Sequence, residues 1–378
     1  MKRLVIAMIL LSAGSILPWG GIESVRFAGA QSGSPGYIDV HMHLDGRYRQ
    51  QGGESGGPGG RRRPGGPGRG PGGPGGEDGG SIKDYESAAV NLISRMDRMG
   101  VAKALIMPPP QKSNQKGGYT YKDLLEVVRK HPDRLALAGG GGELNPMIVG
   151  TDSSAVTAAI KAEFEKKAEE IVGDGARAFG EMTALHFSFH EGHPFEQVAA
   201  DHPLFLLLAD IAARYNIPVD LHMEAVLKDR SLPPRPANMS SANPSTIKAT
   251  IPGFERLLDH NKSAKIVWQH VGWDNTGEMT PDLVRRLLQA HSNLYCAIHE
   301  SRQILDENGK IREAWMKLIT DYPDRFMIGA DTFIGIPGKT KSKGPDMFDK
   351  TWLMLNQLPP DLAQKIGRTN AARVYGLN

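Results

Sequence analysis

The feature that most constrains the fold is a repeated alternation between short apolar segments and longer amphipathic segments. The short segments are rich in β-branched residues, and the long ones space their apolar residues as a helix does, which is typical of parallel strands joined by helical crossovers. Near-continuous apolar strands of this kind favour a closed (β/α)8 TIM barrel of the α/β class, covered outside by helices. Eight strands are predicted, at 37–43, 102–107, 134–139, 176–182, 217–223, 265–270, 294–299 and 325–331.

Helical spacing predicts a helix in each connection and a further pair after the eighth strand. An open, doubly wound sheet is the alternative, and it would usually carry a Gly-rich phosphate-binding turn after its first strand. The first strand here ends instead in Asp39-Val40-His41-Met42-His43, which favours the barrel. The helices are predicted at 85–99, 121–130, 155–171, 203–215, 253–261, 281–290 and 312–321, with the further pair at 346–356 and 361–374.

Residues 1–30 have the pattern of an export signal. Lys2 and Arg3 precede an apolar stretch at 4–17, and Ala28-Gly29-Ala30 supplies small residues for cleavage. The stretch is short for a membrane span, so we expect cleavage after Ala30 and no stable membrane insertion afterwards. The mature protein is then periplasmic or extracellular, and an uncleaved membrane anchor is the alternative.

The remaining chain, 31–378, is expected to be a single catalytic domain, because barrels of this type commonly reach such a length. Residues 50–80 are almost wholly glycine, proline and charged residues, so we expect a disordered insertion within that domain. Loss of residues 1–30 lowers the formal net charge from +3 to about +1, which argues against nucleic acid as a partner. A small-molecule substrate is expected, and a homo-oligomer is compatible with this composition.

Five predicted strands end in a side chain that can bind a metal ion, and TIM barrels build their active sites at these strand ends. His41 and His43 alternate along the first strand, so both imidazoles point to one face. His222 and His270 end the fifth and sixth strands. Asp331 ends the eighth, where an isolated carboxylate is costly unless it is paired or metal-bound. A His-x-His pair alone is a weak signal, but this convergence predicts a metal site.

Glu181 ends the fourth strand, where it can bridge two metal ions or act as a structural carboxylate behind the ligands. The sequence therefore leaves open whether one or two ions bind. A histidine-rich loop follows with His186, His190 and His193, which can contact metal or substrate or can simply form a wall of the barrel mouth.

Further candidates follow the sixth and seventh strands on the same rim. His299 and Arg302 are predicted to contact substrate, because a guanidinium suits a carboxylate or phosphate by bidentate contact. Pairing of Arg302 with Glu300 at the surface is the alternative. Trp273 is predicted as a wall of the substrate pocket.

The segment 38–43, together with the strand-end histidines, Asp331 and the closing segment 369–377, resembles the amidohydrolase superfamily. Within it, the pattern is similar to the branch that includes the aminocarboxymuconate-semialdehyde decarboxylase-like enzymes. The resemblance covers residues 37–378. It implies a divalent ion, usually zinc, held by His41, His43, His222 and Asp331, and a His270 that positions or protonates the reacting group or binds a second ion.

The leading functional prediction is hydrolysis of a small molecule, with activated water attacking a C–N, C–O or P–O centre. A divalent ion lowers the pKa of bound water, and Asp331 is then predicted as the general base. Glu181 favours hydrolysis because a two-metal site has an evident use in activating water. Non-oxidative decarboxylation by the same ligands is one alternative. An exported binding protein without turnover is another, although it would have no need of Asp331.

Overall fold

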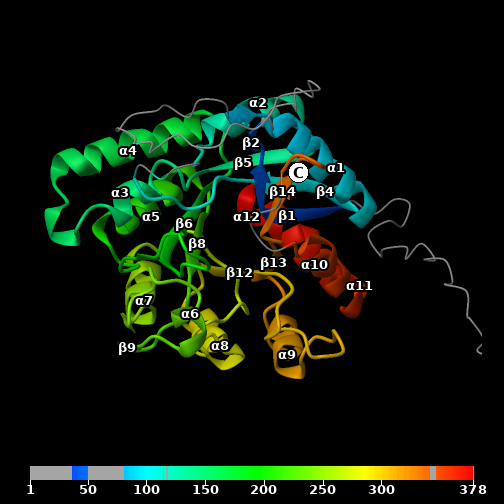
Figure 1. Ribbon diagram of the computed structural model, residues 1–378. Coiled ribbons are helices and arrows are strands. Elements are labelled where there is room, and N and C mark those ends of the chain that lie inside the picture. The colour runs from blue at the N-terminus through cyan, green and yellow to red at the C-terminus, as the bar shows by residue number, and fades with distance from the viewer. Residues whose placement is uncertain (1–35, 50–80, 114, 116–117, 341–345, 378) are drawn as a thin grey trace, which may run out of the picture.

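The computed structural model describes residues 36–49, 81–113, 115, 118–340 and 346–377. Parallel strands that follow one another along the chain lie side by side and are surrounded by helices (Figure 1). This arrangement confirms the predicted TIM barrel. The eight barrel strands are β1 (Tyr37–Asp45), β4 (Val101–Ile106), β5 (Leu135–Gly140), β6 (Ala178–His186), β8 (Val219–Met223), β11 (Ile266–Gln269), β12 (Leu294–Ile298) and β13 (Phe326–Ile328).

The helices between the strands agree closely with the amphipathic segments. Helix α1 shows why: the Asp84 side chain accepts the Ser87 N–H at its start, and Gly100 ends it with a φ of 68°, which glycine adopts without strain. The covering helices are α1 (Tyr85–Met99), α2 (Lys122–Lys130), α4 (Ala158–Gly173), α5 (Pro203–Tyr215), α7 (Ile251–His260), α8 (Pro281–Ala290) and α9 (Glu313–Asp321), followed by α10 (Phe348–Met354), α11 (Pro360–Gln364) and α12 (Asn370–Tyr375).

Two predicted elements are divided in the structure. The eighth strand stops at Ile328 and resumes as β14 (Thr332–Gly335), which pairs in parallel with β1 and so helps to close the barrel. The predicted helix 361–374 is interrupted by a π turn, η4 (Lys365–Thr369). At this turn Gly367 lies against the Tyr37 ring, where an added Cβ would come within 2.6 Å of a ring carbon.

Several short elements lie outside the eight-fold pattern. Residues Arg47–Arg49 (β2) pair antiparallel with Ser81–Lys83 (β3), so the chain on either side of segment 50–80 is joined in a small ladder. Residues Glu196–Gln197 (β7) pair antiparallel with the end of β6, and Arg230–Ser231 (β9) pair with Thr246–Ile247 (β10). The remaining short helices are α3 (Asn145–Val149), η2 (Ser153–Ala155), α6 (Pro234–Ala237) and η3 (Leu355–Gln357).

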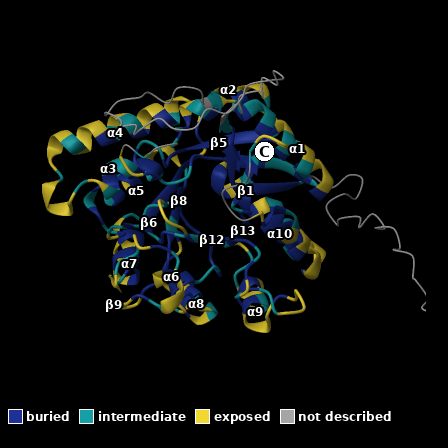
Figure 2. Ribbon diagram, viewed as in Figure 1, coloured by how far each residue is buried: buried dark blue, intermediate teal, exposed yellow. Residues whose placement is uncertain are grey.

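The barrel interior is filled by small and medium apolar side chains, among them Val40, Leu105 and Val267, which are fully buried. Figure 2 shows the strands buried and the outer faces of the helices exposed. Helix α12 belongs to this interior cluster through Val374 and Tyr375, and the Tyr375 hydroxyl donates to Asp220 Oδ1 at 2.6 Å. Side chains therefore pack the barrel through its length, as in other barrels of this type.

The proposed signal at 1–30 and the insertion at 50–80 lie outside the described residues, so export and disorder stay predictions. Among the residues that are described, no helix combines the length and apolar character needed to cross a membrane.

Candidate metal centre

All six predicted metal ligands meet at one end of the barrel. His41 and His43 come from β1, Glu181 from β6 and His222 from β8, while His270 directly follows β11. Asp331 lies in the break between β13 and β14. His41, His43, Glu181 and His270 are buried, and the other two are partly buried. The strand-end argument from the sequence thus predicts this convergence.

The donor atoms of His41, His43 and Asp331 lie close enough together to share one ion, and a Glu181 oxygen approaches the two histidines. His41 Nε2 and His43 Nε2 lie 3.1 Å apart, and Glu181 Oε2 lies 3.5 and 3.4 Å from them. Asp331 Oδ1 lies 3.7 and 3.5 Å from the same two nitrogens. Donors bound tetrahedrally to a zinc ion at about 2.0–2.2 Å are about 3.3–3.6 Å apart. These side chains therefore fit a divalent ion, and we call His41, His43 and Asp331 the first donor group.

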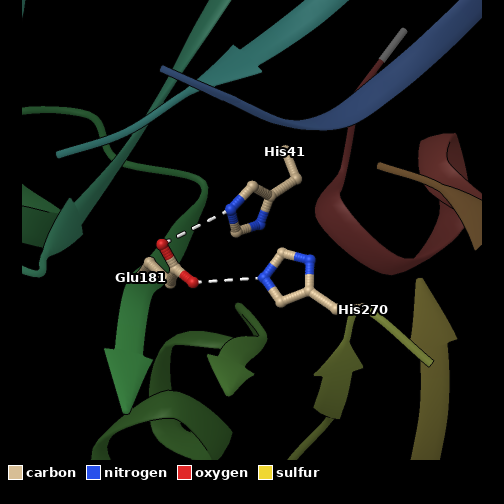
Figure 3. A group of neighbouring side chains, drawn as sticks. All are labelled: His41, Glu181 and His270. Atoms are coloured by element: carbon tan, nitrogen blue, oxygen red, sulfur yellow. Dashed lines mark hydrogen bonds and ion pairs between the residues drawn. The ribbon is translucent and has the colours of Figure 1, made fainter. Parts of the chain in front are cut away.

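The second oxygen of Glu181 faces two further imidazoles. Glu181 Oε1 lies 2.7 Å from His222 Nδ1 and 3.2 Å from His270 Nε2. Figure 3 shows the carboxylate between His41 and His270, with one oxygen directed to each ring. We call His222 and His270 the second donor group. The resemblance implied that His222 binds the same ion as the first donor group. In the structure, His222 instead lies close to Glu181 Oε1, the carboxylate oxygen that is turned away from that group.

Neighbouring groups fix the orientation of the first donor group. His43 Nδ1 lies 2.9 Å from the Met107 carbonyl oxygen, so Nδ1 donates a hydrogen bond and Nε2 is directed toward the centre. Asp39 Oδ1 accepts the backbone N–H groups of His41 and Ala330 at 3.0 and 3.1 Å. The buried Asp39 carboxylate therefore joins the strand that carries both histidines to the residue before Asp331.

Two ligands sit on unusual backbone. His270 and Asp331 have φ values of 59° and 44°, in the left-handed region that non-glycine residues seldom adopt. Such positions cost about 1–3 kcal/mol and persist only where the surroundings enforce them. The Asp331 N–H donates to the His41 carbonyl at 2.9 Å, and the Trp273 N–H donates to the His270 carbonyl at 2.8 Å. The fold thus holds both side chains toward the centre at the expense of local strain.

The electrostatics of the centre suit a cation. Burial raises the pKa of Glu181, but the surrounding histidines outweigh it and hold that pKa well below its ordinary value. Burial and neighbouring histidines act on Asp331 in the same way, and its pKa is also lowered. Two carboxylates therefore remain ionised in a buried pocket. Burial lowers the pKa of His270 to about 4, so this imidazole is neutral at physiological pH.

His299 and Trp273 line the rim beside the second donor group. The His299 Nδ1 lies 2.7 Å from the Glu300 carbonyl oxygen, which leaves Nε2 buried without a hydrogen-bond partner among the described residues. The ring centres of His270 and His299 are 5.5 Å apart, and those of Trp273 and His299 are 5.4 Å apart. Both residues therefore lie beside His270, and their contact with substrate stays a prediction.

Arg302 is not part of the metal-binding cluster. It lines a cavity of about 310 Å³ together with Trp273 and Arg235, a residue that the sequence analysis did not single out. Neither guanidinium forms an ion pair with any residue in the described ranges, and Glu300 instead lies 4.0 Å from Lys350. The alternative of an Arg302–Glu300 pair is therefore not observed.

The histidine-rich loop has one member at the centre. The His186 ring lies 4.6 Å from the His222 ring and 4.9 Å from the His193 ring, centre to centre, while His190 contacts only His193 of this series. Glu196, opposite His186 on β7, is buried and was missed by the sequence analysis. A two-residue strand carries no periodicity from which its burial could be read.

The fold and the convergent donors together define a TIM-barrel protein with a metal-binding centre at the strand C-termini. The sequence matches the family described as Amidohydrolase over residues 151–377, which is more than half of the chain. The chain therefore belongs to the amidohydrolase family. A comparison with curated proteins finds no match.

Similar solved structures include an uncharacterized TIM-barrel protein, Bb4693, from Bordetella bronchiseptica, at 16% identity and a TM-score of 0.47, covering 76% of this chain and 82% of that one. A 2,6-dihydroxybenzoate decarboxylase has 14% identity and a TM-score of 0.44, covering 76% and 87%. A dihydroxybenzoic acid decarboxylase from Polaromonas sp. JS666 with bound manganese has 14% identity and a TM-score of 0.47, covering 91% and 97%.

Proposed function

We propose that this chain is a metal-dependent hydrolase of small molecules with a two-ion centre. The observation that carries the proposal is the position of Glu181, which directs one carboxylate oxygen to the first donor group and the other to the second. Imidazole and carboxylate donors suit zinc as well as other divalent ions. An ion bound here would polarise a substrate carbonyl and lower the pKa of water.

Asp331 has the geometry of a proton acceptor. Its Oδ1 faces His41 and His43, whereas its Oδ2 lies 3.6 Å from His270 Nδ1. The lowered pKa keeps this carboxylate ionised, so Oδ2 can take a proton from an attacking water. His270 Nδ1 is buried without a hydrogen-bond partner in the described part of the chain, so the neutral ring can orient the reacting group or pass that proton on.

The rim residues suit a small substrate. Trp273 and His299 form a wall next to His270, and the cavity of about 310 Å³ beyond them accepts a molecule of modest size. The two guanidinium groups at this cavity, Arg235 and Arg302, would bind a carboxylate or phosphate of that substrate.

Decarboxylation is the second candidate. It is the reaction named for three of the similar solved structures, one of them a 5-carboxyvanillate decarboxylase with manganese. Those likenesses concern the fold, so the observation that favours decarboxylation in this chain is the pair Arg235 and Arg302. Desolvation and repulsion by the charge of Arg302 both lower the pKa of Arg235, against the opposite influence of Glu224. A carboxylate substrate would relieve that repulsion.

The test is metal stoichiometry combined with product analysis. The purified protein, stripped with a chelator and titrated with zinc or manganese, should bind two equivalents per chain. It should then hydrolyse members of a panel of esters, lactones, amides and phosphodiesters. One equivalent, with CO2 release from aromatic carboxylates and no hydrolysis, would select decarboxylation. Absence of bound metal would overturn both reactions and leave a binding protein.

We also propose that the protein is exported. The proposal rests on residues 1–30 and their small-residue cleavage site. N-terminal sequencing of the protein made in a Gram-negative host should give Gln31 as the first residue in the periplasmic fraction. A chain that begins at Met1 in the cytoplasm would contradict it.

A further inference from the structure

A second polar cluster adjoins the metal centre at the point where β6 extends beyond the barrel. The antiparallel register places His186 of β6 opposite Glu196 of β7. Directly opposed residues on such a pair have neighbouring side chains on one face. The His186 ring in turn lies 4.6 Å from the ring of His222. A carboxyl group and an imidazole are thus placed together beside the second donor group.

Both side chains carry a buried polar atom that nothing satisfies. His186 Nδ1 and Glu196 Oε1 are inaccessible to solvent and have no hydrogen-bond partner among the residues described by the structure. Glu196 as a whole residue is only 2% exposed, and His186 is partly buried. Buried polar atoms in folded proteins are nearly always hydrogen-bonded, and exceptions call for a ligand, an ordered water or a functional role. Two such atoms therefore occur on residues that the strand register places opposite each other.

The rest of the cluster holds Glu196 in place but leaves its Oε1 without a partner in the described part of the chain. Asn145 hydrogen-bonds to the Glu196 carboxyl group. Asn145 is itself fixed, because its Oδ1 accepts the Thr183 N–H at 2.9 Å and its amide donates to the Gln111 carbonyl at 3.1 Å. Thr183 is the register partner of His222 in β8. The carboxyl group is therefore positioned by the same strand pair that positions a metal ligand.

We propose that His186 and Glu196 form a subsite for a hydroxyl group of the substrate, beside the bond that reacts at the metal centre. A hydroxyl can donate to Glu196 Oε1 and, with its lone pairs or its proton, serve His186 Nδ1 in either tautomer. The proposal rests on the proposed function, because it takes the metal centre as the place of reaction.

Charge selects a hydroxyl over an ammonium group. The positive charges of Lys112 and His222 act on Glu196 and oppose the negative charge of Glu181. Divalent ions at Glu181 would add to this positive field and disfavour a substrate cation at the subsite. Burial is the main influence on Glu196 and raises its pKa to about 7, so the carboxyl group tolerates a neutral partner.

The test compares ligands that can donate a hydrogen bond with matched ligands that cannot. The zinc-loaded full chain is titrated by calorimetry with the three hydroxybenzoate isomers and with their methoxy counterparts. At least one isomer should bind about tenfold more tightly than its methoxy counterpart, as a hydrogen bond to a buried carboxyl group predicts. In Glu196→Met this ratio should fall to near one, and Glu196→Gln should restore part of it, because the amide oxygen still accepts.

A matched control is Glu143→Met. Glu143 is another largely buried carboxyl group with a pKa raised to about 7 by burial, but it accepts the N–H groups of Tyr121 and Gly140. This variant should keep the wild-type ratio, provided that circular dichroism shows it folded; if it does not fold, Glu143→Gln serves instead.

The possible outcomes distinguish a failure of the subsite proposal from a failure of the proposed function. A hydroxyl preference that survives in Glu196→Met with zinc content intact would overturn the subsite and leave the proposed function standing. Zinc loss in Glu196→Met would also overturn it, by assigning Glu196 to the metal centre. Tighter binding of aminomethylbenzoates than of hydroxybenzoates, or no preference in the wild type, would overturn it as well. A wild-type chain that binds no zinc would overturn the proposed function itself.

Discussion

The two donor groups on either side of Glu181 differ in how firmly the protein holds them. In the first, His43 is oriented by the Met107 carbonyl, and the His41 backbone is tied to the buried Asp39. In the second, His222 is partly exposed, and both imidazoles find their close polar partner in Glu181 itself. One residue of each group, Asp331 in the first and His270 in the second, occupies strained backbone.

This difference predicts the order in which the two sites take up metal ions. A preorganised set of donors binds an ion tightly because little order is lost on binding. The first donor group has that character without help from the second, whereas the second depends on a carboxylate shared between the two. We therefore expect two ions of unequal affinity, the tighter one at the first donor group.

The largest effect is expected from His41→Ala. Removing this imidazole opens the preorganised group, so zinc affinity should fall by more than about a hundredfold. The second ion should be lost too, because Glu181 would no longer be held between two groups. Metal analysis after dialysis checks this, with His131→Ala, a histidine paired with Glu86 away from the centre, as control. Full zinc content in His41→Ala would refute the assignment of the first donor group.

Asp331→Asn should separate binding from turnover. The amide keeps an oxygen that can coordinate, so much of the metal should remain, but it cannot accept a proton, and kcat should fall by about a hundredfold or more. Zinc content and kcat are measured on the same preparation. Unchanged turnover would remove Asp331 from the role of general base and leave it as a ligand alone.

Glu181→Gln should act on the second donor group more than on the first. The neutral amide cannot neutralise two ions, so the stoichiometry should drop from two to one, with the tighter ion retained. His270→Ala should reproduce this result if His270 is a ligand of the second ion. Retention of both ions in His270→Ala, with turnover lost, would instead make His270 a positioning or acid–base residue.

A smaller effect is expected from Asp39→Asn, which probes the support behind the first donor group. The Asp39 carboxylate accepts from two backbone N–H groups and from the Trp352 indole at 3.1 Å. Weakening these bonds should lower the affinity for the tighter ion by about ten- to a hundredfold and leave the occupancy of the second site, at saturating zinc, unchanged. Equal loss at both sites would show that the two groups share their rigidity.

The smallest effect is expected from replacing residues 50–80 by an Asn-Gly turn. The β2–β3 ladder already brings Arg49 and Ser81 together directly after β1, so the stability should change by less than about 1 kcal/mol. Thermal unfolding and zinc titration of the shortened chain check this. A marked loss of the tighter ion would mean that the insertion contributes to the rigidity of the first donor group.

The sequence predicts the fold and the composition of the centre because both follow from periodicity. Strand ends in a barrel converge, so His41, His222 and Asp331 could be brought together without coordinates. Periodicity does not say which oxygen of Glu181 faces which imidazole, since that depends on side-chain rotation and on irregular register between β6 and β8. Nor does it find Glu196, whose burial follows from a long-range pairing of a two-residue strand.

Helix α12 has a consequence for the order in which the chain can fold. Its Val374 and Tyr375 complete the interior cluster that begins with Ile38 and Val40 on the first strand, more than three hundred positions earlier. The Lys265 side chain, directly before β11, donates from Nζ to the Val374 carbonyl oxygen at 2.8 Å and so ties helix α12 to the barrel. While ribosomes are still translating the intervening strands, this interior has an open end. A nascent chain that cannot close its barrel stays unfolded for longer, and an unfolded chain is what the export proposed above would require.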